Sequence, residues 1–223
     1  MYNETVICAV SVLTERQQEE LHMKHKKFDT QQMVTTAMLC AILLIMSFTP
    51  LGYLNIGPLA ISFNMIPVAI GAIALGPIGG MILGGMFGLT SFLQCLGIGG
   101  TSAMGVILFE INPILAFVQR FLPRLLAGFI SGLVFQGVKK ISNTSIACYA
   151  TGFTAALMNT VLFMTTLVLL FGNTEYMQNL IGGRNVIAFI CAFVGINAVV
   201  EMLAASVIVG VVGRVLSKFL VRR

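Results

Sequence analysis

Six long apolar stretches, almost without charge, occupy residues 33–213, and they decide which solvent this chain can fold in. Hydrophobic residues make up 57% of the chain and charged residues 9%, whereas about 25% of a typical soluble domain is charged. A water-soluble fold of this size could not bury so much apolar surface. About 20 apolar residues cross the hydrocarbon core as a helix. The sequence therefore predicts an all-α integral membrane bundle.

The expected transmembrane helices cover residues 33–50, 59–75, 78–96, 112–138, 145–171 and 185–213. Six crossings put the connections 51–58, 97–111 and 172–184 on the outside, and only Arg184 among them is basic. The positive-inside rule then makes the other side cytoplasmic, with both termini there. The basic residues on that side are ten of the 13: Arg16, Lys24, Lys26, Lys27, Lys139, Lys140, Arg214, Lys218, Arg222 and Arg223.

The chain divides by composition into a polar arm, a membrane domain and a short tail. We expect residues 1–32 to form a cytoplasmic arm, residues 33–215 the membrane domain, and residues 216–223 a basic cytoplasmic tail. The run Met23-Lys-His-Lys-Lys is typical of a natural bacterial start. Residues 1–22 are therefore interpreted as an upstream extension or a disordered arm.

Several classes of function are disfavoured by what the sequence lacks. The five cysteines are scattered, with no CxxC or Cys/His cluster, so neither a metal site nor a disulfide framework is expected. No Gly-x4-Gly-Lys-Ser/Thr loop occurs, so ATP hydrolysis by that route is not expected of this chain. No nucleophile–base pair can be assembled for an enzyme, and no cofactor is implied. The net charge is +5. Because most of the basic residues lie on one predicted side of the membrane, this charge does not indicate nucleic-acid binding.

Small residues recur at helical spacing in two places. Gly76, Gly80, Gly84 and Gly88 share one helix face, which predicts close packing against a neighbouring helix. Ala37 and Ala41 form a small flat patch on the first span, and this spacing on its own favours ordinary helix packing.

Three charges inside the predicted spans need a reason, because charge in hydrocarbon is costly. Arg124 and Glu201 lie at similar depth, so a structural ion pair is expected, with a ligand role for Arg124 as the alternative. Arg120 has no obvious acidic partner in the sequence and lies nearer the outside. Its planar guanidinium suits a carboxylate ligand, although snorkelling to the outer interface explains it equally well.

Polar amides add to the case for an internal site. Each one alone could simply hydrogen-bond to a neighbouring helix, but together they indicate a pocket for a small neutral or anionic molecule. The candidate amides in or at the ends of the spans are Asn64, Gln94, Asn112, Asn159 and Asn197.

The chain resembles the substrate-binding S component of an energy-coupling factor (ECF) vitamin transporter. The sharpest match is the stretch 56–77, IGPLAISFNMIPVAIGAIALGP, and the Ala-x3-Ala of span one, Ser91-Phe92 and the run Pro123-Arg124-Leu-Leu-Ala-Gly128 agree with it. The resemblance implies a bacterial cell membrane of the Gram-positive type and a vitamin bound from outside. It also implies docking through Ala37 and Ala41 on a membrane scaffold subunit, with two cytoplasmic ATPases supplying the energy.

Among vitamins, the resemblance favours pantothenate. Gln94-Cys95 followed by the small-residue loop 97–105, GIGGTSAMG, is similar to pantothenate-type members. Arg120 would then hold the carboxylate, and amides such as Gln94 and Asn159 the remaining polar groups. Riboflavin, folate and a pyridoxine- or thiamine-related vitamin stay open as ligands. So do two other classes of protein, a stand-alone secondary carrier using Glu201 as its coupling acid and a membrane scaffold that does not transport.

Overall fold

The structure, a computed structural model, describes residues 30–49, 52–56, 59–99, 102–181 and 186–221. The chain divides into two units, Met1–Thr35 and Thr36–Arg223, and each is described by itself. In the first unit the described residues begin a helix, in which the Thr35 hydroxyl donates to the Gln31 carbonyl at 2.8 Å. The interpretation of residues 1–22 lies outside the described residues.

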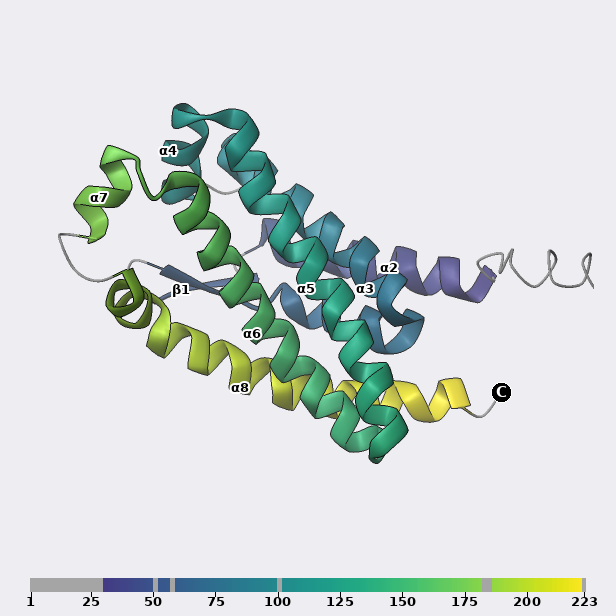
Figure 1. Ribbon diagram of the computed structural model, residues 1–223. Helices are drawn as coiled ribbons and strands as arrows, with labels where there is room; N and C mark the ends of the chain where they lie inside the picture. Colours follow the sequence, from purple (N-terminus) through teal and green to yellow (C-terminus); the bar gives the residue numbers. More distant parts are fainter. Residues whose placement is uncertain (1–29, 50–51, 57–58, 100–101, 182–185, 222–223) are drawn as a thin grey trace, which may run out of the picture. The chain divides into compact units, whose positions relative to one another are not determined.

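Helices dominate the described chain, with one short hairpin (Figure 1). The elements are α2 (Thr30–Phe48), β1 (Tyr53–Ile56), β2 (Leu59–Ser62), α3 (Met65–Cys95), α4 (Ala103–Ile111), α5 (Pro113–Ile141), α6 (Thr144–Phe171), α7 (Glu175–Ile181) and α8 (Val186–Val221). Within the described ranges, five helices are long and apolar enough to cross a membrane: α2, α3, α5, α6 and, in α8, the segment Ala198–Ser217. The predicted helical membrane architecture is confirmed at this level.

Helix α3 reverses direction in its middle. Gly76 has φ 76° and ψ −166°, which is not helical, and Pro77 follows it. Glycine is the residue that reaches this backbone conformation without strain, and proline disfavours a helical residue before it. A Cβ placed on Gly80 would lie 2.9 Å from the Cβ of Ala72, so the second arm folds back along the first. The segments expected at 59–75 and 78–96 are therefore the two arms of one helical hairpin.

The prediction that this helix begins at residue 59 is wrong. Residues 59–62 form β2, which pairs antiparallel with β1 in the register Tyr53↔Ser62 and Ile56↔Leu59. Helix α3 begins only at Met65. A short apolar run such as Leu-Ala-Ile-Ser fits a strand as well as a helix, and periodicity alone cannot separate the two.

Three further boundaries differ from those expected. The connection 97–111 contains helix α4, and the connection 172–184 contains helix α7. Helix α8 continues to Val221, into the segment expected to be a tail. These differences lie at the ends of the bundle, where polar residues and turns interrupt the apolar pattern.

The second arm of α3 lies against α5 with backbone touching backbone. A Cβ on Gly80 would collide with the carbonyl of Gly128, and one on Gly84 would collide with the carbonyl of Arg124. A Cβ on Gly88 would lie 2.8 Å from the Cα of Phe121. No residue larger than glycine fits at these positions without moving a helix. Gly76 has a different role, because it forms the reversal.

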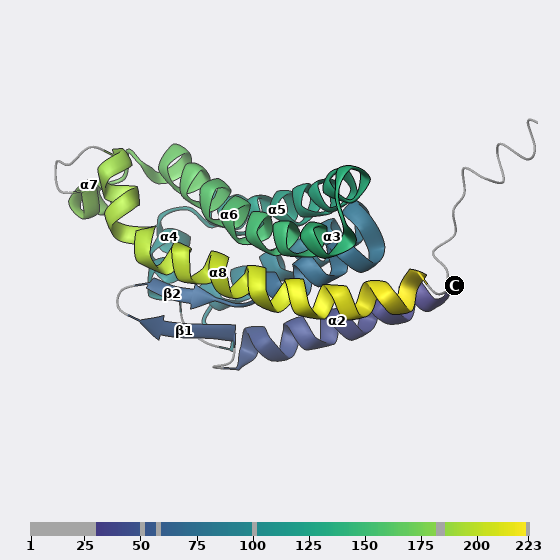
Figure 2. The ribbon, with the colours of Figure 1, turned by 90° about the horizontal axis from the view of Figure 1, so that it is seen from below.

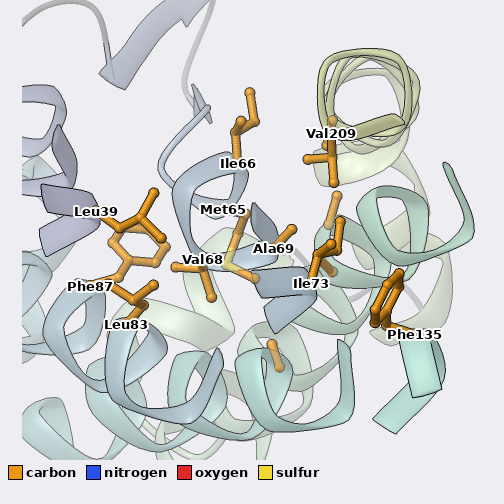
Figure 3. Close-up of a cluster of buried hydrophobic side chains, with 14 of the residues drawn as sticks. Leu39, Met65, Ile66, Val68, Ala69, Ile73, Leu83, Phe87, Phe135 and Val209 are labelled. Carbon is orange, nitrogen blue, oxygen red and sulfur yellow. The ribbon is translucent and has the colours of Figure 1, made fainter. Parts of the chain in front are cut away.

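The apolar core has two parts. The larger cluster joins α2, α3, α5, α6 and α8, and Figure 3 shows Leu39, Leu83 and Phe87 on one side of it and Phe135 and Val209 on the other. The smaller cluster joins α4, α5, α6 and α7 through Leu108, Ala116, Leu167, Phe171 and Met177.

The two ends of the bundle are defined by which turns lie together. A Cβ on Gly76 would lie 3.3 Å from Nε2 of Gln136, and one on Gly213 would lie 2.8 Å from Cδ1 of Ile73 and 3.1 Å from Sγ of Cys148. The α3 reversal, the α5–α6 turn and Gly213 therefore share one end. Helices α4 and α7 lie at the other end. Figure 2 shows the β1–β2 hairpin beside the part of α8 that leads to this end.

Candidate functional site

Two arginines on α5 are buried among aromatic rings. Arg120 is 6% exposed and Arg124 is 5% exposed. The Cζ atoms of both lie 5.3 Å from the centre of the Phe163 ring on α6, and that of Arg124 lies 4.5 Å from the Phe87 ring on α3. A desolvated cation over an aromatic face gains about 2 kcal/mol. The rings therefore offset part of the cost of burying these charges.

Arg120 reaches the start of helix α4. Its Nη2 donates to Oγ of Ser102 at 3.2 Å, and the same Oγ caps α4 by accepting from the backbone N–H of Gly105 at 3.3 Å. The N-terminus of a helix carries a partial positive charge. A guanidinium and a helix N-terminus thus converge on one place, and that arrangement is complementary to an anion.

Arg124 points back along its own helix and interacts electrostatically with Glu201. Its Nη1 donates to the carbonyl of Arg120 at 2.6 Å. Glu201 is 8% exposed, interacts with the charge of Arg124, and is hydrogen-bonded to the backbone of Ser62. Glu201 therefore connects α8 to the end of β2. The ion pair between Arg124 and Glu201 stays a prediction, and the attraction between the two charges favours it.

Two of the candidate amides, Gln94 and Asn112, hold helices in place. The Gln94 Nε2 donates to the carbonyl of Ser47 at 2.7 Å, and the Ser47 hydroxyl lies 3.2 Å from that of Thr90, so this pair of contacts ties α2 to α3. The Asn112 side chain caps α5 by accepting from the N–H groups of Ile114 and Leu115 at 3.1 and 3.2 Å.

Asn64 and Asn159 are placed differently. Asn64 is fully buried just before α3, and neither polar atom of its amide has a hydrogen-bond partner among the described residues. Asn159 on α6 is 8% exposed, and within the described chain its Oδ1 also has none. Asn197 lies in α8, but its side chain is outside the described part. Asn64 and Asn159 thus have hydrogen-bonding capacity that no described residue uses.

Sequence reasoning missed Gln119. This side chain is 0% exposed, and neither its nitrogen nor its oxygen has a partner in the described ranges. The signal was available, because Gln119 is an uncharged amide inside the expected span 112–138, like the amides that were singled out. Its position next to Arg120 made the charge the more prominent feature.

Helix α2 turns one face inward and leaves another uncovered. Leu39, Leu43 and Ser47 are buried, whereas Ala37 and Ala41 are exposed. The small residues of this helix thus lie on the face that packs against nothing else in the described second unit. Such a face can approach another helix closely.

The fold and the buried cluster define a class, namely a multi-pass membrane protein with cationic and amide groups inside its bundle. The particular family follows from comparison. Residues 31–213 match the family described as ECF transporter, substrate-specific component. The chain belongs to this family, which confirms the resemblance stated above, and it is a transport subunit rather than an enzyme.

Two curated relatives extend over most of the chain. The pantothenate transporter PanT of Leuconostoc mesenteroides is 32% identical over 200 residues, which cover 84% of this chain and 92% of the relative. The pantothenic acid transporter PanT of Lactococcus lactis is 27% identical over 160 residues, which cover 67% of this chain and 78% of the relative.

Proposed function

We propose that this chain is the high-affinity pantothenate-binding S component of an ECF importer in a Gram-positive bacterial cell membrane. The ligand is inferred from the 32% identity to a pantothenate transporter over most of both chains. The structural observation that carries the proposal is the convergence of Arg120 and the α4 N-terminus. Pantothenate has one carboxylate, and this is the one group of the vitamin that such a positive site would select.

The residues divide into those that contact the vitamin and those that shape its site. Arg120 is proposed to bind the carboxylate. Asn64, Asn159 and Asn197 are proposed to meet the hydroxyls and the amide. Gln94 and Asn112 are assigned to the border of the site, because their side chains already hold helices in place.

The chain is proposed to cross the membrane six times with both termini in the cytoplasm. The reversal at Gly76 supports this, since it turns α3 into two antiparallel arms. The exposed residues Lys139, Lys140 and Arg214 fall at or beside the end that carries the reversal, as the positive-inside rule requires of a cytoplasmic end. Helix α4 and Arg120 then belong to the outer half.

The exposed Ala37/Ala41 face of α2 is proposed to dock on the ECF scaffold subunit. The family implies a vitamin substrate and an energising ECF module; two cytoplasmic ATPases are the proposed source of energy. Helix α2 has only the methyl groups of alanine at these two positions, so a partner helix can approach closely and slide along it.

The test is titration calorimetry on the purified full-length chain, with pantothenate, riboflavin, folate, pyridoxine and thiamine compared under identical conditions. Tightest binding of pantothenate supports the assignment, and tighter binding of another vitamin overturns it. Uptake in cells should also require co-expressed scaffold and ATPases. Accumulation by vesicles that hold this chain alone, lost in Glu201→Gln, would instead establish the secondary carrier.

A further inference from the structure

Gln119 is a buried amide to which none of the described residues hydrogen-bonds. Other fully buried polar side chains on α5 and α6 satisfy themselves locally, since the hydroxyls of Ser131 and Thr151 donate to carbonyls four residues earlier. Gln119 makes no such contact within the described ranges. A buried amide without partners costs stability, so its presence calls for a partner outside the described chain.

The position of Gln119 on α5 indicates what it faces. Ala116, Gln119, Pro123 and Ala127 are all buried and follow one stripe of the helix at steps of three, four and four residues. Ala116 belongs to the cluster that contains Met164 and Leu167 of α6, and Ala127 belongs to the cluster that contains Ala155 and Ala156 of α6. The stripe residues on either side of Gln119 thus share apolar clusters with α6, and Gln119 lies between them.

The interval of α6 between Ala156 and Met164 holds Asn159 and Phe163. Phe163 is the ring shared by the two arginines, and Asn159 has an amide oxygen with no partner among the residues described. Gln119 directly precedes Arg120, and Asn159 lies one helical turn before the Phe163 ring that Arg120 and Arg124 share. Both amides therefore carry hydrogen-bonding groups that no described residue uses, close in sequence to these contacts.

We infer that Gln119 forms a second polar subsite with Asn159, which binds an uncharged hydroxyl or amide group of the ligand while Arg120 binds its carboxylate. This inference rests on the proposed function. A primary amide both donates and accepts, so it suits a hydroxyl or an amide of pantothenate, and it adds no charge preference of its own. Gln119 therefore contributes affinity for the hydroxyl and amide groups of the ligand, whereas Arg120 contributes affinity for its carboxylate.

The experiment compares Gln119→Met with the control Gln136→Met. Methionine has the length of glutamine without its polar atoms, and Gln136 is the exposed glutamine of the same helix. Full-length protein in lipid nanodiscs is titrated with pantothenate and with pantothenol, in which the carboxylate is replaced by a hydroxymethyl group. Thermal melting of the ligand-free protein is measured in parallel.

Gln119→Met should bind both compounds at least tenfold more weakly than the parent, with their affinity ratio unchanged. Its ligand-free melting temperature should equal or exceed that of the parent, because removing an unsatisfied buried amide relieves a cost. Gln136→Met should leave both affinities unchanged. Arg120→Ala should instead reduce the preference for pantothenate over pantothenol.

Three results would overturn the inference. Unchanged affinity in Gln119→Met would remove the residue from the site. A lower melting temperature or failure to fold would show that Gln119 supports the structure. Loss of pantothenate affinity alone would place it at the carboxylate. If the parent chain binds no pantothenate, the proposed function fails, which is a separate outcome.

Discussion

The backbone contact between α3 and α5 gives a prediction with a built-in control. In Gly84→Ala the new Cβ would collide with the carbonyl oxygen of Arg124, and it would lie 3.1 Å from the carbonyl carbon of Arg124 and 3.3 Å from the Cα of Leu125. These are all main-chain atoms, which cannot rotate out of the way as a side chain does. The two helices must therefore move apart.

The magnitude follows from a comparison with Gly137→Ala. Gly137 lies on α5, and a Cβ there would meet nothing within 4 Å. Both substitutions gain about 0.5–1 kcal/mol from replacing glycine inside a helix. Only Gly84→Ala also suffers overpacking, which typically costs 1–3 kcal/mol. We expect Gly84→Ala to be less stable than Gly137→Ala by about 1–3 kcal/mol.

Stability can be followed through the thiols, since the chain has no tryptophan for intrinsic fluorescence. Cys148 is 0% exposed and Cys95 is 2% exposed, so a thiol-reactive dye should report their exposure on heating. Gly84→Ala should melt earlier than Gly137→Ala in detergent. Equal melting of the two variants would refute the backbone contact.

Three further predictions concern single side chains. Arg120→Ala should weaken pantothenate binding by about 1.5–3 kcal/mol, the value of a charge-assisted hydrogen bond, and unchanged calorimetric affinity would remove it from the site. Ala37→Trp or Ala41→Trp should abolish uptake in cells while the purified chain keeps its affinity, and parallel loss of both properties would contradict a docking role. Asn112→Ala should lower stability by about 0.5–2 kcal/mol through loss of the α5 cap. Its control is Asn143→Ala, since Asn143 precedes α6 without a capping hydrogen bond, and equal destabilisation in thermal melts would argue against the cap.

The sequence was sufficient for features that depend on composition and simple periodicity. Long uncharged apolar runs predict membrane helices because hydrocarbon tolerates little else. The family resemblance rested on residues within 33–215, and the match to residues 31–213 confirms it. Gly80, Gly84 and Gly88 share a face by their spacing, and the structure shows α5 against that face.

Other features depend on contacts that no linear pattern contains. Leu59–Ser62 is a strand because Tyr53–Ile56 folds back onto it, a partner choice invisible in either segment alone. Gln94 and Asn112 look alike as amides at span ends, yet one bridges two helices and the other caps one. The sequence shows Gln119 only as an amide inside a span, and its lack of partners among the described residues is known only from the structure.

The break at Gly76 has a consequence for how far a solute must travel. The first arm of α3, residues 65–75, is about 16 Å long at 1.5 Å per residue, roughly half of a 30 Å hydrocarbon layer. The β1–β2 hairpin would have to span the rest of that depth, and its strand β2 ends at Ser62 beside the buried Glu201. Non-helical backbone survives at such depth only when it is enclosed by protein or reached by water. In the proposed six-span arrangement this hairpin would have to be enclosed by the bundle or wetted from its outer end, and such a wetted opening would shorten the path of a nutrient to its binding groups.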